Sequence, residues 1–423
     1  MNTPDAQREA TSISARLVRG LRTHGIALGM SALVFAIFLG TLRADARIWL
    51  GRGVLASTRT HFMDLENILA GARCAAQGMD VLVRNPCDSV GRPMNYPRVW
   101  LAIADGLGLS HASPVLPGIV LAGWFFLSAA FLPRIRSLPR ALVWLLALLS
   151  PAVTLAVERG NNDLVVFSLA VLGLALLDKG TLAKYGAGVV LFLVSILKLF
   201  PAFGLLLLPS KHALGRRGWV YLGMFILATL ATWRDVLAIG RAVPHDLFMS
   251  FGGETSVAVF CALVFHSRLE PTLAQALGCV LLIALIGVGL LWGVRKAKQN
   301  DPVAKSFHPH LLYGTLLFLG AFATGSNYDY RLIVLLLVLP TTLDVGEARL
   351  DQRGCRTLAR VCTGLVLLSL WVGGTFPSPY PAPRFALVLL DMLATPILVC
   401  ALTMLACALH LTREIGNADI PGK

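Results

Sequence analysis

The chain has 423 residues, of which 56% are hydrophobic and only 14% are charged. Soluble globular domains carry nearer to ~25% charged residues, so this composition excludes a soluble enzyme and indicates an integral membrane protein. The formal net charge of +14 does not indicate nucleic-acid binding. Much of the lysine and arginine falls in short loops between apolar segments, which is the positive-inside pattern.

The N-terminal region combines a basic segment, residues 1–24, with an apolar run at 25–42. Ala44-Asp45-Ala46 follows and resembles a signal-peptidase site, so a cleaved signal peptide is one interpretation. The apolar run, however, is longer than the ~7–15 residues of a signal-peptide core. We therefore expect an uncleaved first transmembrane helix.

The first loop, residues 43–113, is the largest in the chain. Apolar or small residues recur within it at helical spacing, at Leu65, Ile68, Leu69, Ala72, Ala75 and Ala76. This period predicts an amphipathic helix that begins at Asp64 and lies along the membrane surface. Cys74 and Cys87 both fall in this loop. If the loop is outside the cytoplasm, a disulfide is allowed, and we predict one; two free thiols are the alternative.

Further apolar segments long enough to cross, or nearly cross, a bilayer fall at roughly 114–132, 141–157, 164–177, 219–236, 272–293, 309–323, 331–343, 358–374 and 386–409. Residues 185–209 contain Pro201 and form either one kinked span or a hairpin that turns at Lys198. A single span would place the basic loop at 211–217 outside, so the charge rule favours the hairpin. Residues 256–266 are too short to span and are a candidate re-entrant segment.

These segments predict an all-α fold, a polytopic transmembrane bundle of roughly 10–12 spans with both termini cytoplasmic. Residues 1–423 form one integral membrane domain, with no internal repeat and no soluble domain. Three polar clusters, at 61–66, 158–163 and 325–331, then share the extracytoplasmic face with loops 43–113, 237–254 and 375–384. Ionisable residues at the ends of spanning helices are functional candidates by default.

Each candidate also has a structural interpretation. Asp64 could cap the loop helix, and Asn161-Asn162-Asp163 could cap the helix that follows them. Lys198 could extend to the membrane interface. Arg331 could be an interfacial anchor, with Tyr328 and Tyr330 in an aromatic belt. Glu254 and His245 are most simply solvated residues of loop 237–254.

The order and placement of these motifs resemble the GT-C superfamily of membrane glycosyltransferases, and most closely its bacterial polyprenol-phosphate-mannose-dependent branch. The shared elements are Asp64 at the start of a loop helix, Asn95-Tyr96-Pro97, Gly160-Asn161-Asn162-Asp163, Lys198-Leu199-Phe200-Pro201 and Asn327-Tyr328-Asp329-Tyr330-Arg331. They span about residues 60–340. The Cys74/Cys87 pair departs from this branch and leaves the substrate open.

The resemblance implies an inverting glycosyltransferase of the bacterial inner membrane with its active site on the extracytoplasmic face. It would move a hexose, such as mannose, from a polyprenyl-phosphate donor to a lipid or glycan acceptor. Asp64 would take the proton of the acceptor hydroxyl, with Glu66 as a supporting acid. Cations would stabilise the phosphate that leaves, so neither cofactor nor metal is expected. The implied substrate-binding residues are Arg331, Arg159, Lys198, Asn162, Asp163, Asn327, Asp329 and Tyr96.

Two other classes of protein fit a polytopic chain. A transporter or lipid flippase tends to carry inverted repeats and helices broken at the midplane, whereas the polar clusters here lie at helix ends. A polysaccharide polymerase or ligase would use a diphosphate-linked donor. The families of that type place their large loop late in the chain, and here it comes first.

Overall fold

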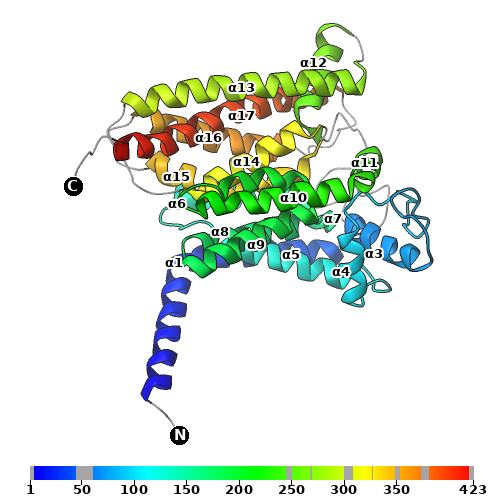
Figure 1. Cartoon of the computed structure of the whole chain (residues 1–423), viewed down its shortest axis with the longest axis horizontal. Coiled ribbons are helices and arrows are strands. Elements are labelled where there is room, and N and C mark those ends of the chain that lie inside the picture. The colour runs from blue at the N-terminus through cyan, green and yellow to red at the C-terminus, as the bar shows by residue number, and fades with distance from the viewer. Residues whose placement is uncertain are drawn as a thin grey trace.

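The computed structural model describes residues 4–43, 61–243, 250–266, 269–299, 308–325, 327–347, 353–372 and 381–418. The fold is almost entirely helical, as the sequence predicts (Figure 1). Its α-helices are α1 (Pro4–Arg43), α3 (Met63–Ala76), α4 (Val99–Gly106), α5 (Val115–Ala130), α6 (Leu138–Leu148), α7 (Pro151–Arg159), α8 (Asp163–Leu177), α9 (Thr181–Leu197), α10 (Trp219–Ala231), α11 (Trp233–Ala242), α12 (Gly253–Val264), α13 (Pro271–Gln299), α14 (Pro309–Ala323), α15 (Leu339–Glu347), α16 (Arg353–Val372) and α17 (Pro381–Ala418).

Shorter elements connect these helices. Three are 3-10 helices, namely η2 (Phe200–Leu207), η3 (Gly215–Gly218) and η4 (Asp329–Leu337). Two short strands, β1 (Ser250–Phe251) and β2 (Asn327–Tyr328), pair antiparallel, with Ser250 opposite Tyr328 and Phe251 opposite Asn327. This pairing joins the end of loop 237–254 to the polar cluster at 325–331.

Four of the described helices contain a stretch long and apolar enough to cross a membrane, namely Thr23–Leu42, Pro271–Lys296, Gly354–Val372 and Met392–His410. The number rises to six if two bent pairs each count as one span. These pairs are α6 with α7, bent by 45°, and the segment Gly215–Ala231 with α11, bent by 77°. Five further apolar helices have 10–17 residues. The chain is therefore a multi-pass membrane protein, while the count of 10–12 spans stays a prediction.

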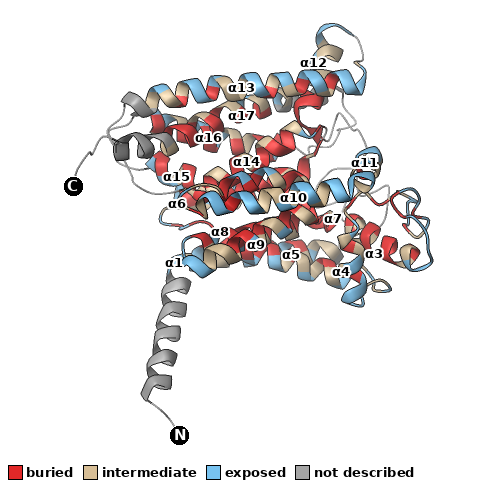
Figure 2. Ribbon diagram, viewed as in Figure 1, coloured by how far each residue is buried: buried red, intermediate tan, exposed pale blue. Residues whose placement is uncertain are grey.

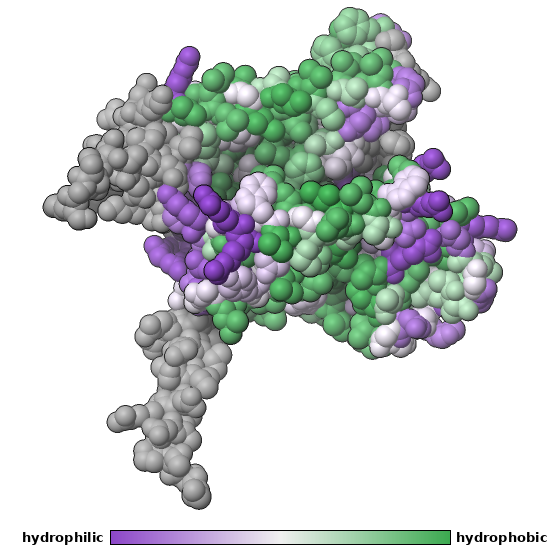
Figure 3. All heavy atoms as spheres, viewed as in Figure 1, coloured by the Kyte–Doolittle hydropathy of each residue, from purple (hydrophilic) through white to green (hydrophobic). Residues whose placement is uncertain are grey.

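The outer faces of the bundle are apolar. None of the residues of α10, all of which the structure describes, is buried, and Leu227 and Leu230 are 67% and 64% exposed. Buried residues lie between the helices, while exposed ones follow the outer sides of α10 and α13 (Figure 2). Hydrophobic surface covers this middle region, and hydrophilic residues gather around α11, α3 and α4 and near the start of α10 (Figure 3). Such an apolar surface on a folded chain suits contact with lipid.

Several sequence boundaries differ from the structure. The segment expected at 141–157 is broken at Ser150-Pro151, because Pro151 begins a new helix and lacks the N–H needed to continue the preceding one. The loop expected at 375–384 ends earlier, since α17 begins at Pro381. Residues 256–264 of the segment at 256–266 lie within α12, which packs against α13. The signal-peptide alternative at 44–46 lies outside the described residues.

The hairpin predicted at 185–209 is confirmed. Helix α9 ends at Leu197, Lys198 has an extended backbone, and η2 then returns alongside α9. Lys184 Nζ, near the start of α9, donates a 2.9 Å hydrogen bond to the carbonyl oxygen of His212. The chain has therefore reversed between these residues, and Lys198 lies at the turn.

The described part of the first loop, residues 61–113, folds into a small unit with its own core. The predicted amphipathic helix is α3, and its buried Ile68 and Leu69 pack with Met94 and Trp100 from the rest of the loop. Trp100 Nε1 also donates a 2.8 Å hydrogen bond to the carbonyl oxygen of Leu197. The loop therefore packs against the end of α9, next to Lys198.

Candidate functional site

The turn between α7 and α8 brings the site together. Ser150 caps α7 by accepting a hydrogen bond from the Val153 N–H, and the helix ends at Gly160 with φ +57°. Glycine adopts this left-handed conformation without the steric cost of a Cβ. A Cβ at Gly160 would also lie 3.0–3.1 Å from the side chain of Phe62. Phe62 is fully buried, and its N–H bonds the carbonyl oxygen of Glu158, so the start of α3 is fixed against the end of α7.

Asp64 lies at this junction and is almost completely buried, with 4% of its surface exposed. Arg159 donates to it at two points, from Nε to Oδ2 at 2.9 Å and from Nη2 to Oδ1 at 2.6 Å. Asn161 Nδ2 donates to Oδ2 at 2.6 Å, and Arg92 Nη1 lies 3.5 Å from Oδ1. The interpretation of Asp64 as a helix cap is wrong, because its carboxylate bonds these side chains and Phe62 is the N-cap residue.

The charge state of Asp64 follows from these contacts. Burial alone would raise the pKa of its carboxyl group, because the charged form is desolvated. The charge and hydrogen bonds of Arg159, with those of Asn161 and the charge of Arg92, outweigh burial and hold the pKa below the usual 3.8. Asp64 is therefore a carboxylate at neutral pH.

Asn161 connects Asp64 to Lys198. Its Nδ2 donates to Asp64, while its Oδ1 accepts from Lys198 Nζ at 3.2 Å. Lys198 Nζ also donates to Asn162 Oδ1 at 2.7 Å and forms an ion pair with Asp163 Oδ2 at 2.8 Å. The lysine is 6% exposed, so its extension to the membrane interface is excluded. Asn161 Oδ1 also accepts a 2.9 Å hydrogen bond from the Asp163 N–H at the start of α8, as the capping interpretation expects. Capping is not the whole role of residues 161–163, since all three bind Lys198.

Arg331 and two tyrosines complete the cluster. Arg331 Nε lies 3.8 Å from Asp163 Oδ2, and its guanidinium stands 5.1 Å from the centre of the Phe200 ring. Tyr330 stacks on Tyr328, and the Tyr330 ring faces both Arg159 and Lys198 at 5.8 Å. Tyr330 is 5% exposed. It is therefore part of the site and not of an aromatic belt facing lipid.

Tyr96 also contacts the cluster. Its hydroxyl oxygen accepts a 3.4 Å hydrogen bond from Asn161 Nδ2, and its ring faces Lys198 Nζ at 5.6 Å. Burial, with the nearby charge of Asp64, raises the pKa of the Tyr96 hydroxyl well above its usual 10. The hydroxyl therefore keeps its proton at neutral pH.

Two cavities adjoin the cluster. One, of about 650 Å³, is lined by Lys198, Arg331 and Glu254 together with Phe200 and residues of α11. The other, of about 550 Å³, has almost entirely apolar walls formed by α3, α4, α5 and α8, including Leu65, Trp100 and Val120. Asn162 lies on its lining. The buried polar cluster therefore lies between a cationic cavity and an apolar one.

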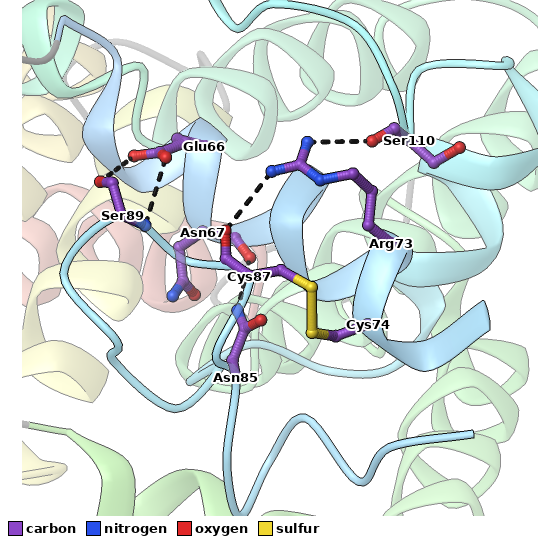
Figure 4. Close-up of a disulfide and its surroundings, with 8 residues drawn as sticks. All are labelled: Glu66, Asn67, Arg73, Cys74, Asn85, Cys87, Ser89 and Ser110. Carbon is purple, nitrogen blue, oxygen red and sulfur yellow. Dashed lines mark hydrogen bonds between the residues drawn. A yellow bond between two sulfur atoms is a disulfide. The ribbon is translucent and has the colours of Figure 1, made fainter. Parts of the chain in front are cut away.

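Two of the remaining predicted residues, Glu66 and Asn327, form hydrogen bonds outside this cluster. Glu66 accepts hydrogen bonds from the N–H and hydroxyl of Ser89 (Figure 4), so it does not face Asp64. Asn327 donates its side-chain amide to the carbonyl oxygens of Ala321 and Gly325, which supports the local turn. Asp329 is buried at the start of η4. Glu254 is 6% exposed, so the prediction of a solvated residue is wrong there, while His245 lies outside the described residues.

The predicted disulfide between Cys74 and Cys87 is present and ties residues 85–92 to α3 (Figure 4). This segment supplies Arg92, which the sequence indicates only as part of a Gly-Arg-Pro turn. Asn161 and Tyr330 stand in the quoted motifs, but from the sequence they have only structural interpretations, as a helix cap and as part of an aromatic belt. An arginine next to a proline in a long loop gives no indication in the sequence that it contacts a carboxylate 28 positions earlier.

Glu158 is a further buried acid next to Arg159. It is 5% exposed, and neither carboxylate oxygen has a hydrogen-bond partner among the residues that the structure describes.

Comparison with protein-family models, with curated proteins and with solved structures finds no match for this chain. Within the described ranges, no group of three or more His, Cys, Asp or Glu side chains is arranged to hold a metal ion.

Proposed function

We propose that this protein is an inverting membrane glycosyltransferase that moves a hexose from a polyprenyl-phosphate donor to the hydroxyl group of a lipid or glycan acceptor. In this proposal the bundle has 10–12 spans and both termini are cytoplasmic. The site lies on the extracytoplasmic face of a bacterial inner membrane. The resemblance to GT-C enzymes suggests the donor, and the geometry around Asp64 supports the chemistry.

The main support for the proposal is the position of the Asp64 carboxylate. A single side chain separates it from Lys198, which lines a cavity together with a second cation. Asn161 alone separates the carboxylate of Asp64 from the ammonium group of Lys198. Lys198 and Arg331 both line the 650 Å³ cavity. An acceptor hydroxyl needs a carboxylate to take its proton, and a phosphate leaving group needs positive charge.

The transfer step can be written with these groups. The acceptor oxygen forms a bond to the anomeric carbon as the bond between that carbon and the phosphate oxygen breaks. Attack from the side opposite the phosphate inverts the anomeric configuration. The proton of the acceptor passes to Asp64, and the electron pair of the broken bond stays on the phosphate, where Lys198 and Arg331 stabilise it.

Arg159 has a role beyond the phosphate binding that the sequence suggests. Its guanidinium is engaged with Asp64 at two points, so it holds the proposed base. This ion pair lowers the pKa of Asp64 and keeps the carboxylate deprotonated. A donor phosphate that attracted Arg159 would weaken the ion pair and make Asp64 a stronger base as the substrate arrives.

The apolar cavity supports a lipid-linked substrate. Its walls come from the loop helices α3 and α4 and from the apolar helices α5 and α8, and its inner lining includes Asn162 of the cluster. A hydrocarbon chain in this cavity would bury apolar surface while its polar head reached the charged residues.

A transfer assay tests the proposal. Purified protein in lipid vesicles receives a polyprenyl-phosphate hexose with a labelled sugar, together with extracted membrane lipids and glycans as acceptors. We expect a labelled product whose anomeric configuration, measured by NMR, is opposite to that of the donor. Strict dependence on a nucleotide sugar, or movement of the donor across the bilayer without transfer, would reject the proposal.

A further inference from the structure

Residues 85–92, here called the strap, are attached to α3 along their whole length. The Cys74–Cys87 disulfide forms one attachment, and Arg73 donates a further hydrogen bond to the carbonyl oxygen of Cys87 (Figure 4). Three further hydrogen bonds connect the strap to α3. Asn85 Nδ2 donates to the Asn67 carbonyl oxygen, and Asn67 Nδ2 donates to Asp88 Oδ1. The Ser89 hydroxyl donates to Glu66. So many attachments over eight residues fix the strap relative to the start of α3.

Arg92, at the end of the strap, transmits this arrangement to Asp64. Its Nε and Nη2 donate to the two oxygens of Asp88 at 3.1 and 2.9 Å, and its backbone N–H donates to Asp88 Oδ2 at 2.9 Å. The same Nη2 donates to the carbonyl oxygen of Met63 at 2.7 Å, and Nη1 lies 3.5 Å from Asp64 Oδ1. A guanidinium held on both oxygens of one carboxylate has little freedom. The Arg92 guanidinium therefore fixes Met63, the first residue of α3, and contacts Asp64, the second.

We propose that Arg92 is a positioning residue for Asp64 and that the Cys74–Cys87 disulfide keeps it in place, so that sugar transfer requires the oxidised strap. The inference rests on the proposed function, in which Asp64 is the base. It adds a residue and a covalent bond to the site as the GT-C resemblance describes it.

The disulfide can act on Arg92 because the residues that connect them are close together in the chain. Asp88 follows Cys87 directly, and Asp88 anchors the guanidinium of Arg92. When the disulfide is opened, the strap regains conformational freedom that the bond had removed. A thiol reductant supplies two electrons and two protons, the S–S bond breaks to give two thiols, and the reductant becomes a disulfide. Cys74 is fully buried and Cys87 is partly exposed, so we expect a reductant to approach the disulfide from the side of Cys87.

The experiment measures kcat and donor KM for Arg92→Gln, Asp88→Asn and the double variant Cys74→Ser/Cys87→Ser, each purified without reductant. Arg84→Gln is the matched control, because Arg84 is an exposed arginine of the same loop. We expect kcat to fall about 10- to 100-fold in the three strap variants, the cost of a slightly misplaced catalytic group, with donor KM unchanged. Reduction should lower kcat of the wild type equally and leave the double variant unaffected.

Hydrogen exchange provides a second readout that needs no transfer. Amide exchange at residues 62–68 should accelerate in each strap variant and in the reduced wild type, while exchange in α14 stays at the wild-type rate. A purely electrostatic role of Arg92 predicts instead that Asp88→Asn is silent, because the charge of Arg92 remains. A binding role toward the donor phosphate predicts a raised donor KM with little change in kcat.

Unchanged kcat in Arg92→Gln, or unchanged exchange at residues 62–68 in all the strap variants, would overturn the inference. So would either of the alternative kinetic patterns above. If the wild type transfers no sugar at all, the proposed function fails, and the exchange rates still decide whether Arg92 and the disulfide position the start of α3.

Discussion

Arg159 and Asp64, 95 positions apart in the sequence, form a two-point ion pair of 2.9 and 2.6 Å at the centre of the site. Both side chains are shielded from solvent, with 15% and 5% of their surface exposed. Removing one partner of a buried pair leaves the other charge unpaired, which costs about 3–5 kcal/mol. A mutation of Asp64 therefore changes stability as well as chemistry, and experiments on it must separate the two.

The first prediction uses a compensated variant of the proposed base. Asp64→Asn should abolish most of the transfer, by about 10²-fold or more, because the amide cannot take the acceptor proton. The variant also leaves Arg159 unpaired, so we expect lower thermal stability. The double variant Asp64→Asn/Arg159→Gln removes both charges and should regain stability without regaining transfer. Thermal unfolding and transfer rate are measured on the same samples.

Arg159→Gln alone is the control for this comparison, because it keeps the carboxylate. If Asp64 serves only as the partner of Arg159, the double variant should transfer sugar about as well as Arg159→Gln does. That outcome would remove Asp64 from the role of base.

The second prediction concerns pH. The pKa of Asp64 lies below 3.8 because Arg159 and its neighbours outweigh burial. Its folded pKa is thus depressed, so the stability from this group is present above the unfolded pKa and is lost as pH falls through the folded value. For the same reason the acidic limb of kcat/KM that Asp64 causes should lie at lower pH than the limb of an ordinary aspartate. In Arg159→Gln burial dominates, and the acidic limb of the profile should move toward neutral pH.

Arg331→Gln is the matched control for this pH profile, because Arg331 pairs with Asp163 and not with Asp64. Its acidic limb should stay where the wild-type limb lies. An Arg159→Gln profile with the same acidic limb as the wild type would show that the titrating base is another group.

The third prediction tests the phosphate ligands. Arg331 lines the cationic cavity, so Arg331→Ala should raise the donor KM about 10-fold or more, the effect of losing a hydrogen bond to a charged group. Arg331→Lys keeps the charge but not the two-point geometry and should be milder. Arg98→Gln is a suitable control, since Arg98 pairs with Asp80 and Asp235 in more exposed contacts. Equal donor KM values in all three variants would exclude Arg331 as a ligand.

The fourth prediction concerns the orientation of the bundle. Leu107 is 66% exposed in the first loop, and Leu182 is 86% exposed at the start of α9. Cysteine placed at 107 should react with a membrane-impermeant maleimide added to intact cells, whereas cysteine at 182 should react only after the membrane is opened. The reverse labelling pattern would place the site on the cytoplasmic face, where the disulfide would be unexpected.

The sequence alone determines the features of this protein that depend on local composition and period. An apolar chain with basic short loops predicts a multi-pass membrane protein, and the helical spacing after Asp64 predicts α3. Pro201 and the basic residues at 211–217 predict the hairpin whose turn carries Lys198. The two cysteines of one loop predict the disulfide. Each signal lies within a few tens of residues, so no knowledge of tertiary contacts is needed.

The partners of the charged residues depend on the tertiary structure. Glu66 is two positions from Asp64, but residues at i and i+2 do not share a helix face, so Glu66 meets Ser89 and not the site. Arg159, predicted as a phosphate ligand, pairs with Asp64, a contact that the sequence does not indicate. Arg92 joins the cluster because the strap folds back on α3. Burying an unpaired charge costs free energy, and only the packing of the loop unit against the α7–α8 turn decides which residue becomes the partner of Asp64.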